Sequence, residues 1–214
     1  GLVLVYRATR VINFAVGNLG VVGAAVLVLI VENHSVPIWL ATVIALVIGL
    51  ALGAIVELVV VRRLFTAARV TLLVATIGVA QLLQALVVGL PKVKGATAAK
   101  YPVLLSGRWE QFGVSVSGAQ VAILVAVPLC AGLLGWFLNG TRIGGAVIAS
   151  ADNSRLARTH GINPKLVSTL VWSIAGLLST VSMVLIAGQA GRATGLATLG
   201  PNTMIRALAA VVIA

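Results

Sequence analysis

Five long, mostly apolar runs constrain the fold of this chain more than any other feature of its sequence. A helix needs about 20 consecutive apolar residues to cross the hydrocarbon core of a membrane, which is about 30 Å thick. The runs cover residues 11–31, 37–61, 70–90, 119–138 and 166–187. The sequence therefore predicts an all-α, polytopic transmembrane helical bundle with about five complete spans, forming one domain over residues 1–214.

Shorter apolar stretches at the two ends predict partial spans, at residues 1–6 and 202–214. We therefore expect the sequence to be a fragment of a longer membrane chain. The first stretch does not resemble a signal peptide, because no charged region and no cleavage site flank a short apolar core.

The net charge of +11 does not indicate a nucleic-acid partner. Basic residues gather at the ends of the apolar runs and form no stripe with interleaved aromatic residues. If the spans alternate, the turns 62–69 and 139–165 lie on one side of the membrane, and 91–118 and 188–201 on the other. The first side holds seven Lys and Arg residues and the second holds five, which favours the first side as cytoplasmic.

The first run contains polar and small residues that an ordinary membrane span lacks. Its segment INFAVGNLG places Asn13 and Asn18 beside Gly17 and Gly20. Gly17, Gly20 and Ala24 share one helical face, which favours close packing against another helix. The alternative is a local break in the helix, which exposes backbone groups toward a protein-lined path.

Small and charged residues in the second run predict contacts between helices. Gly49 and Gly53 form a notch in which a neighbouring helix can approach closely. Glu57 lies near the end of the run, and Arg62 and Arg63 follow it. A carboxylate at this depth is costly unless it is paired, so an ion pair is favoured over a proton relay.

Polar residues in the third run and in the following loop predict further contacts. Thr76, Gln81 and Gln84 fall on one side of a helix, where they would hold helices together or, less often, line a pathway. The loop at residues 91–118 is expected to be an ordered segment outside the membrane. Tyr101 and other aromatic residues of this loop would anchor it at the membrane interface.

The polar segment 141–165 lies between two apolar runs, and its residues predict a short, well-defined helix. Asp152 is predicted to cap the start of this helix, and Gly161 to end it in a left-handed turn. Asn163 and Pro164 then predict that a new helix starts at once, with proline at its first position.

The residues between these caps favour a docking surface. Leu156 and Ala157 are apolar, whereas Arg155 and Arg158 carry charge. A simple connector between two spans needs no helix with defined ends. The alternative is an interfacial helix that lies among lipid headgroups and is attracted to anionic lipid by its arginines.

Sequence motifs of enzymes and channels are absent. The chain contains no GxxxxGK(S/T) phosphate loop and no HExxH, CxxC or GxSxG motif. The sequence also lacks a glycine-rich segment whose carbonyl groups could form a selectivity filter, so it does not indicate a channel. The single cysteine, Cys130, lies inside an apolar run, so a disulfide framework and a metal cluster are not expected.

Four segments of the chain resemble the permease subunits of branched-chain amino acid ABC transporters. They are LVYRATRVINFAVGNLG, VELVVVRR, ATIGVAQLLQ and TRIGGAVIASADNSRLARTHGIN, in this order along essentially the whole chain. The resemblance implies a longer parent chain and a coupling helix, which in that family docks in a groove of the ATP-binding subunit. By position, this helix covers residues 153–160 and is closed by Gly161.

The resemblance implies a permease subunit of an ABC importer in the plasma (inner) membrane, with no enzymatic activity of its own. Expected partners are ABC ATPase subunits, a second permease subunit (identical or homologous), an extracytoplasmic solute-binding protein and membrane lipids. No cofactor is expected to bind directly, and ATP would act through the partner subunit. The residues implied for docking are Asp152, Asn153, Arg155, Leu156, Ala157, Arg158 and Gly161. The candidates for the solute path are Asn13, Phe14, Gly17, Asn18 and Gln84.

Several positions depart from the family pattern and leave the solute open. Val16 replaces a frequent histidine and Asn18 a frequent acidic residue, and Gly145, Val147 and Ile148 make the start of the polar segment less basic. Related permeases carry urea, other amino acids or amides, and sugars. A different class of function also stays open, namely a non-transporting membrane scaffold whose polar helix binds a cytoplasmic partner.

Overall fold

The computed structural model describes residues 4–6, 13–65, 67–90, 101–103, 105, 107–111, 114–191 and 196–213. The helices are α2 (Val16–His34), α3 (Ile38–Val56), α4 (Arg69–Gly89), α5 (Gly118–Gly140), α6 (Arg142–Asp152), α7 (Ser154–Thr159), α8 (Pro164–Ala190) and α9 (Leu196–Ile213). A π-helical turn, η1 (Glu57–Val61), and a 3-10 turn, η2 (Arg62–Leu64), continue α3. The strands β1 (Arg108–Gln111) and β2 (Val114–Ser117) form an antiparallel hairpin.

Five helices in the described part of the chain are long and apolar enough to cross a membrane. They are Val16–His34, Ile38–Leu64, Val70–Gly89, Gly118–Gly140 and Pro164–Ala190. The predicted polytopic helical bundle is therefore confirmed, and four of the five spans begin within two residues of the predicted position. The exception is the first span, whose helix begins at Val16 instead of residue 11.

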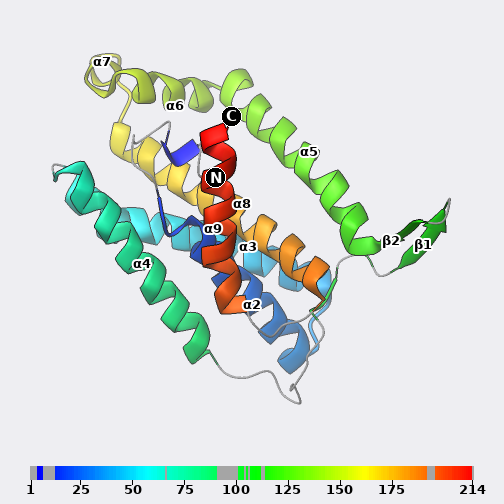
Figure 1. The fold of residues 1–214 in the computed structure, drawn as a ribbon. Coiled ribbons are helices and arrows are strands. Elements are labelled where there is room, and N and C mark those ends of the chain that lie inside the picture. The colour runs from blue at the N-terminus through cyan, green and yellow to red at the C-terminus, as the bar shows by residue number, and fades with distance from the viewer. Residues whose placement is uncertain are drawn as a thin grey trace.

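Helix α8 lies at the centre of the bundle (Figure 1). It packs against α2 and α3, which also pack against each other, and α9 packs on α2. In the view of Figure 1, α4 and α5 lie on opposite sides of this group. Helices α6 and α7 lie at one end of α5, and the β1–β2 hairpin lies at its other end, as alternating spans require.

Glycines allow α3 and α8 to approach until their backbones touch. A Cβ atom built on Gly176 of α8 would lie against the carbonyl oxygen of Gly49 and 3.2 Å from the Cα atom of Gly53. A Cβ atom on Gly53 would lie 3.1 Å from the Cα atom of Ser173. The predicted packing notch at Gly49 and Gly53 is therefore confirmed.

Helix α2 uses its own glycines in the same way. A Cβ atom on Gly20 would lie against the backbone of Ser179 in α8. One on Gly17 would lie 3.1 Å from the carbonyl carbon of Gly200 in α9. The close packing predicted for this face of the first span is present, and it places α2 between α8 and α9.

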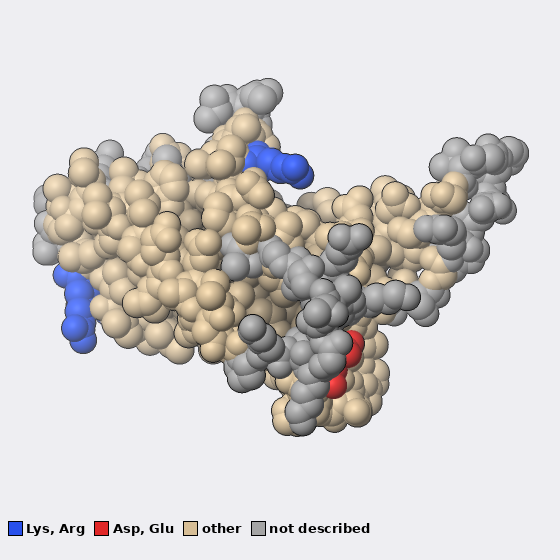
Figure 2. All heavy atoms as spheres, turned by 60° about the horizontal axis from the view of Figure 1, so that its bottom comes forward, with Lys and Arg blue, Asp and Glu red and all other residues tan. Residues whose placement is uncertain are grey.

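The surface of the bundle is apolar, as a lipid environment requires. Large hydrophobic side chains are exposed on the flanking helices, including Val88 of α4 (73%) and Leu124 of α5 (70%). Figure 2 shows one face on which very few described side chains carry a charge. Such a surface is stable where the neighbouring molecules are acyl chains or other membrane helices.

Tyr101 does not anchor the chain at the membrane interface, contrary to the prediction. Its side chain is only 2% exposed, and its hydroxyl group donates to the carbonyl oxygen of Ala24 in α2 (3.2 Å). The backbone N–H of Tyr101 donates to the carbonyl oxygen of Gly191 (3.2 Å). Burial raises the pKa of the Tyr101 hydroxyl group, which keeps the proton available for this bond.

Candidate functional site

The polar segment 141–165 folds as two short helices at one end of the bundle. The Oγ1 atom of Thr141 accepts a hydrogen bond from the N–H of Gly144 (2.9 Å) and so caps the start of α6. Gly144, Val147 and Ser150 are buried, so one face of α6 rests on the rest of the chain. Helix α7 follows at the far end of α6 (Figure 1).

Helix α7 is capped by Asn153 and not by Asp152. The Oδ1 atom of Asn153 accepts a hydrogen bond from the N–H of Leu156 (3.0 Å). Asp152 is the last residue of α6, and its side chain is exposed. The prediction was wrong by one residue because α6 continues through Asp152, whereas an N-cap needs the extended backbone that Asn153 adopts.

Gly161 ends α7 in a left-handed turn, as predicted, with φ of +78°. The N–H of Ile162 donates to the carbonyl oxygen of Ala157 (3.0 Å), and the N–H of Gly161 donates to that of Arg158 (3.0 Å). These two bonds form a Schellman motif, which satisfies carbonyl groups at a helix end.

Helix α8 starts almost immediately after this turn. The Oδ1 atom of Asn163 accepts from the N–H of Lys165 (3.1 Å), and Pro164 occupies the first turn, as predicted. Only residues 160–163 separate α7 from α8. Because the Schellman motif and the Asn163 cap fix most of this connection, a displacement of α7 would be passed on to α8.

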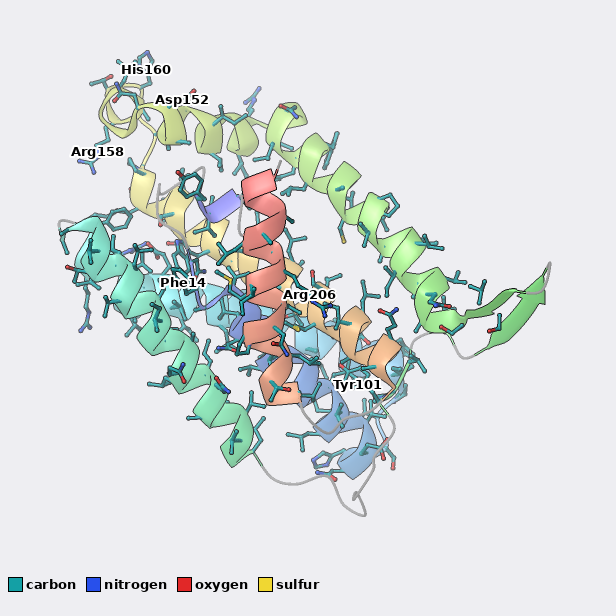
Figure 3. All side chains as sticks on the ribbon, in the orientation of Figure 1. Phe14, Tyr101, Asp152, Arg158, His160 and Arg206 are labelled. Carbon is teal, nitrogen blue, oxygen red and sulfur yellow. The ribbon has the colours of Figure 1, made fainter. Side chains whose placement is uncertain are left out.

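The outward side of α7 combines one apolar side chain with basic ones. The side chain of Leu156 is 56% exposed, whereas that of Ala157 is 4% exposed. The prediction that both residues form the docking contact was wrong for Ala157, because adjacent helical residues point about 100° apart and Ala157 faces its own chain. Arg158 and His160 are exposed, and in Figure 3 His160 lies on the side of α7 that faces away from the spans. The side chain of Arg155 lies outside the described part.

An ion pair at the end of α3, between buried Glu57 and partly exposed Arg62, is hydrogen-bonded to the start of α8. Glu57 is fully buried, and its Oε2 atom lies 3.2 Å from the Nη2 atom of Arg62. The Oγ1 atom of Thr169 lies 2.8 Å from the same Oε2 atom and 2.6 Å from the same Nη2 atom. Arg62 also donates to the carbonyl oxygen of Lys165 (3.1 Å). The predicted pairing of Glu57 with an arginine is confirmed.

The contact of Thr169 with Glu57 and Arg62 was not predicted from the sequence. The position of Thr169 in the sequence could have indicated this contact. Thr169 lies one helical turn after Lys165, at the depth where Glu57 of the neighbouring span needs a hydrogen-bond partner. Through Thr169, the start of α8 is held to the end of α3.

Helix α2 begins close to the middle of the membrane. The hydroxyl group of Ser179 in α8 donates to the carbonyl oxygen of Val16, the first residue of α2. Ser179 lies well inside α8 (Pro164–Ala190), roughly 22 Å from the start of that helix and 17 Å from its end at 1.5 Å per residue. A helix N-terminus at this depth carries backbone N–H groups that only protein groups or a wet cavity can satisfy.

Asn13 and Thr76 satisfy two of the backbone groups just before α2. The Oδ1 atom of Asn13 accepts from the N–H of Ala15 (2.9 Å), and the Oγ1 atom of Thr76 accepts from the N–H of Phe14 (3.3 Å). Asn13 is fully buried, and its Nδ2 atom has no hydrogen-bond partner among the described residues. The predicted close packing is present, and α2 begins only at Val16. That this start borders a solute path stays a prediction.

The remaining candidates for the solute path are not all brought together. Asn18 is 5% exposed, and its Nδ2 atom donates to the carbonyl oxygen of Ala80 in α4 (2.8 Å). Gln84 is eight residues after Thr76 and is therefore about 12 Å further along α4. Gln81 is exposed and Thr76 is fully buried, so the face that these residues were predicted to share does not include Gln81.

Comparisons with known proteins indicate the family of the chain. The sequence model of the family described as "Branched-chain amino acid transport system / permease component" matches residues 1–214. The high-affinity branched-chain amino acid transport system permease protein LivH of Escherichia coli K12 is 28% identical over 199 residues, which cover 87% of this chain and 64% of LivH.

Two further relatives come from other organisms. The permease protein BraD of the high-affinity branched-chain amino acid transport system of Pseudomonas aeruginosa is 28% identical over 204 residues, covering 89% of this chain and 66% of BraD. The probable branched-chain amino acid transport permease protein LivH of Methanocaldococcus jannaschii is 29% identical over 187 residues, which cover 85% of this chain and 58% of that protein. No solved structure matches the chain.

The chain spans about 64% of the length of the LivH relative from Escherichia coli. The family match, by contrast, extends over all of its residues, and five of its helices can cross a membrane. The chain is therefore a multi-pass membrane protein that belongs to the family of permease components of branched-chain amino acid transport systems.

Proposed function

We propose that the protein containing this chain is the transmembrane permease subunit of an ABC importer for branched-chain amino acids in the plasma (inner) membrane. Its partners are ATP-hydrolysing subunits, a second permease subunit and an extracytoplasmic solute-binding protein. ATP binds to the partner subunits, and the permease holds no cofactor. The names of the relatives support the solute class, and urea or sugar is the alternative within the same fold.

The observation that carries this proposal is the construction of α7. It is a helix of six residues with a side-chain cap at its start and a Schellman motif at its end, and it presents the exposed Leu156. An isolated helix this short is unstable in water. The caps at both ends of α7 therefore indicate that the helix is kept folded to contact a partner. An exposed apolar side chain on a helix that also carries the exposed Arg158 suits a groove in a water-soluble partner.

The connections of α7 suggest how ATP hydrolysis moves the spans. Movement of a bound ATPase subunit shifts α7, and the short connection through Gly161 and Asn163 passes the shift to α8. Because Thr169 and the Glu57–Arg62 pair hold α8 to α3, these two helices move together. The interrupted start of α2, with Asn13, Phe14, Gly17 and Asn18, then borders the path that opens and closes.

The proposal is tested by the substitution Leu156→Asp in the full-length permease, co-expressed with its ATPase subunit. An aspartate in a desolvated groove costs on the order of several kcal/mol, so the ATPase should no longer co-purify while the permease still inserts. Ile143→Asp is the matched control, because Ile143 is a similarly exposed residue (52%) on α6. If Leu156→Asp retains the ATPase as well as Ile143→Asp does, the docking role of α7 is wrong.

A further inference from the structure

Arg206 is a charged residue in the interior of α9, and the proposed function so far gives it no role. Its side chain is exposed, and it has no hydrogen-bond or ion-pair partner among the described residues. Its neighbour Ala207 lines the same cavity as Leu178 and Ser182 of α8. Both of these lie roughly 12 Å or more from either end of α8, so Arg206 lies deep within the membrane. An unpaired charge at such depth is costly and marks a functional site.

Two adjoining cavities of suitable size for a small solute lie beside the part of α9 that carries Arg206. A cavity of about 230 Å³ lies between α2, α8 and α9, and one of about 360 Å³ lies between α5 and α8. Both are lined by Leu178, Ser182 and Ile186, so the two cavities adjoin along α8, and we refer to them together as the groove. In Figure 3, Arg206 points from α9 toward the side on which α8 and α5 lie.

The start of α2 faces the smaller of these two cavities. Val16 and Gly17, which form the first turn of α2, line the cavity together with Thr203 of α9. The first turn of a helix carries a partial positive charge on its N–H groups, and interrupted membrane helices direct such ends at anionic groups of solutes. The guanidinium group of Arg206 and the start of α2 therefore favour the same ligand charge.

Hydrogen-bond acceptors and apolar walls complete the groove. The hydroxyl group of Ser182 donates to the carbonyl oxygen of Leu178 (2.8 Å), and that of Thr203 donates to that of Leu199 (2.8 Å). Because their protons are engaged inside their own helices, both oxygens are left to accept from a ligand. The part of the groove toward α5 is lined by Ile123, Val127, Cys130 and Leu134.

We propose that this groove is a binding site for a free α-amino acid with an apolar side chain. The carboxylate binds Arg206 and the start of α2, the ammonium group donates to Ser182 and Thr203, and the side chain lies against α5 and α8. The proposal rests on the proposed function and deepens it by assigning the group that recognises the solute carboxylate.

Direct binding of leucine tests this site in the full-length permease assembled with its ATPase subunit, without the solute-binding protein. Radiolabelled leucine is measured by equilibrium dialysis up to millimolar concentration, against leucinamide and 4-methylpentanoate as competitors. We expect leucinamide, which lacks the carboxylate, to compete at least about tenfold more weakly than leucine, because a charge-assisted bidentate contact is lost. Equal competition by leucine and leucinamide, or no leucine binding, would overturn the proposal.

The variants Arg206→Gln and Arg206→Lys separate a ligand contact from a structural one. Arg206→Gln should weaken leucine binding at least about tenfold, Arg206→Lys should weaken it less, and Arg63→Gln, at an exposed arginine after α3, should bind like the wild type. If Arg206→Gln lowers the melting temperature and leaves leucine affinity unchanged, Arg206 pairs with a carboxylate of the assembly and the site is wrong. If Arg206→Gln does not assemble, the leucinamide comparison on the wild type decides.

Uptake by the complete transport system distinguishes the two proposals. Unchanged leucine binding by Arg206→Gln, in a system whose wild type takes up leucine, rejects only the carboxylate site. A wild-type system that takes up no amino acid rejects the proposed function itself.

Discussion

The close contact of α3 and α8 predicts that one added methyl group separates two helices that should move together. In Gly176→Ala, the new Cβ atom would lie against the carbonyl oxygen of Gly49, 3.1 Å from its carbonyl carbon and 3.2 Å from the Cα atom of Gly53. Carbon atoms in ordinary contact are about 3.5–4.0 Å apart. Because all three neighbours are backbone atoms, no side chain can turn aside, and the helices must move apart.

The size of the effect follows from a comparison with Gly132→Ala in α5. A Cβ atom on Gly132 meets nothing within 4 Å. Replacing glycine by alanine inside a helix gains about 0.5–1 kcal/mol in either variant, so this contribution cancels between them. The difference that remains is the overpacking of Gly176→Ala, about 1–3 kcal/mol.

Thermal unfolding of the full-length protein in detergent measures this difference. Trp172 is fully buried beside the contact, so in a background with Trp39, Trp109 and Trp136 replaced its fluorescence reports the separation of α3 and α8. At about 2–4 °C per kcal/mol, Gly176→Ala should melt several degrees below Gly132→Ala. Equal melting temperatures for the two variants would show that α3 and α8 are not in backbone contact, and the reasoning would fail.

Two further predictions concern polar groups inside the membrane. Glu57→Gln should lower the free energy of unfolding by about 1–3 kcal/mol, less than the cost of breaking a fully buried pair because Arg62 is partly exposed; an unchanged melting temperature would show that the pair is not needed. Asn13→Leu should reduce uptake or shift solute preference with expression and ATPase assembly intact, if the start of α2 lines the solute path; a lower melting temperature with unaltered selectivity would instead assign Asn13 to packing.

The spans and the ends of the short helices could be predicted because their causes are local. Apolar length alone fixes a membrane helix, and Gly161, Asn163 and Pro164 act on their own backbone. The exact cap was missed because Asp152 and Asn153 are both good N-caps, and the choice between them depends on where α6 ends. Ala157 was assigned to the surface because its burial depends on how α7 lies against the rest of the chain.

Contacts between distant segments could not be predicted from the sequence, for a different reason. Thr169 meets Glu57 across 112 positions, and Asn18 meets Ala80 across 62, so no periodicity within one run indicates them. Arg206 carried a local signal, as a lone charge in the last apolar stretch. The sequence alone does not show what this charge could bind. The structure adds that α9 lies against α2 and α8, beside the groove that Ser182 and Thr203 line.

ATP-dependent uptake of radiolabelled leucine tests the central claim most directly. Full-length permease, its partner permease subunit and its ATPase are reconstituted in proteoliposomes with the solute-binding protein outside and ATP inside, and accumulation is compared for wild type, Ile143→Asp and Leu156→Asp. The account predicts accumulation in wild type and Ile143→Asp, and loss of accumulation in Leu156→Asp. Absence of leucine accumulation in the wild type, or accumulation that persists in Leu156→Asp, would contradict it.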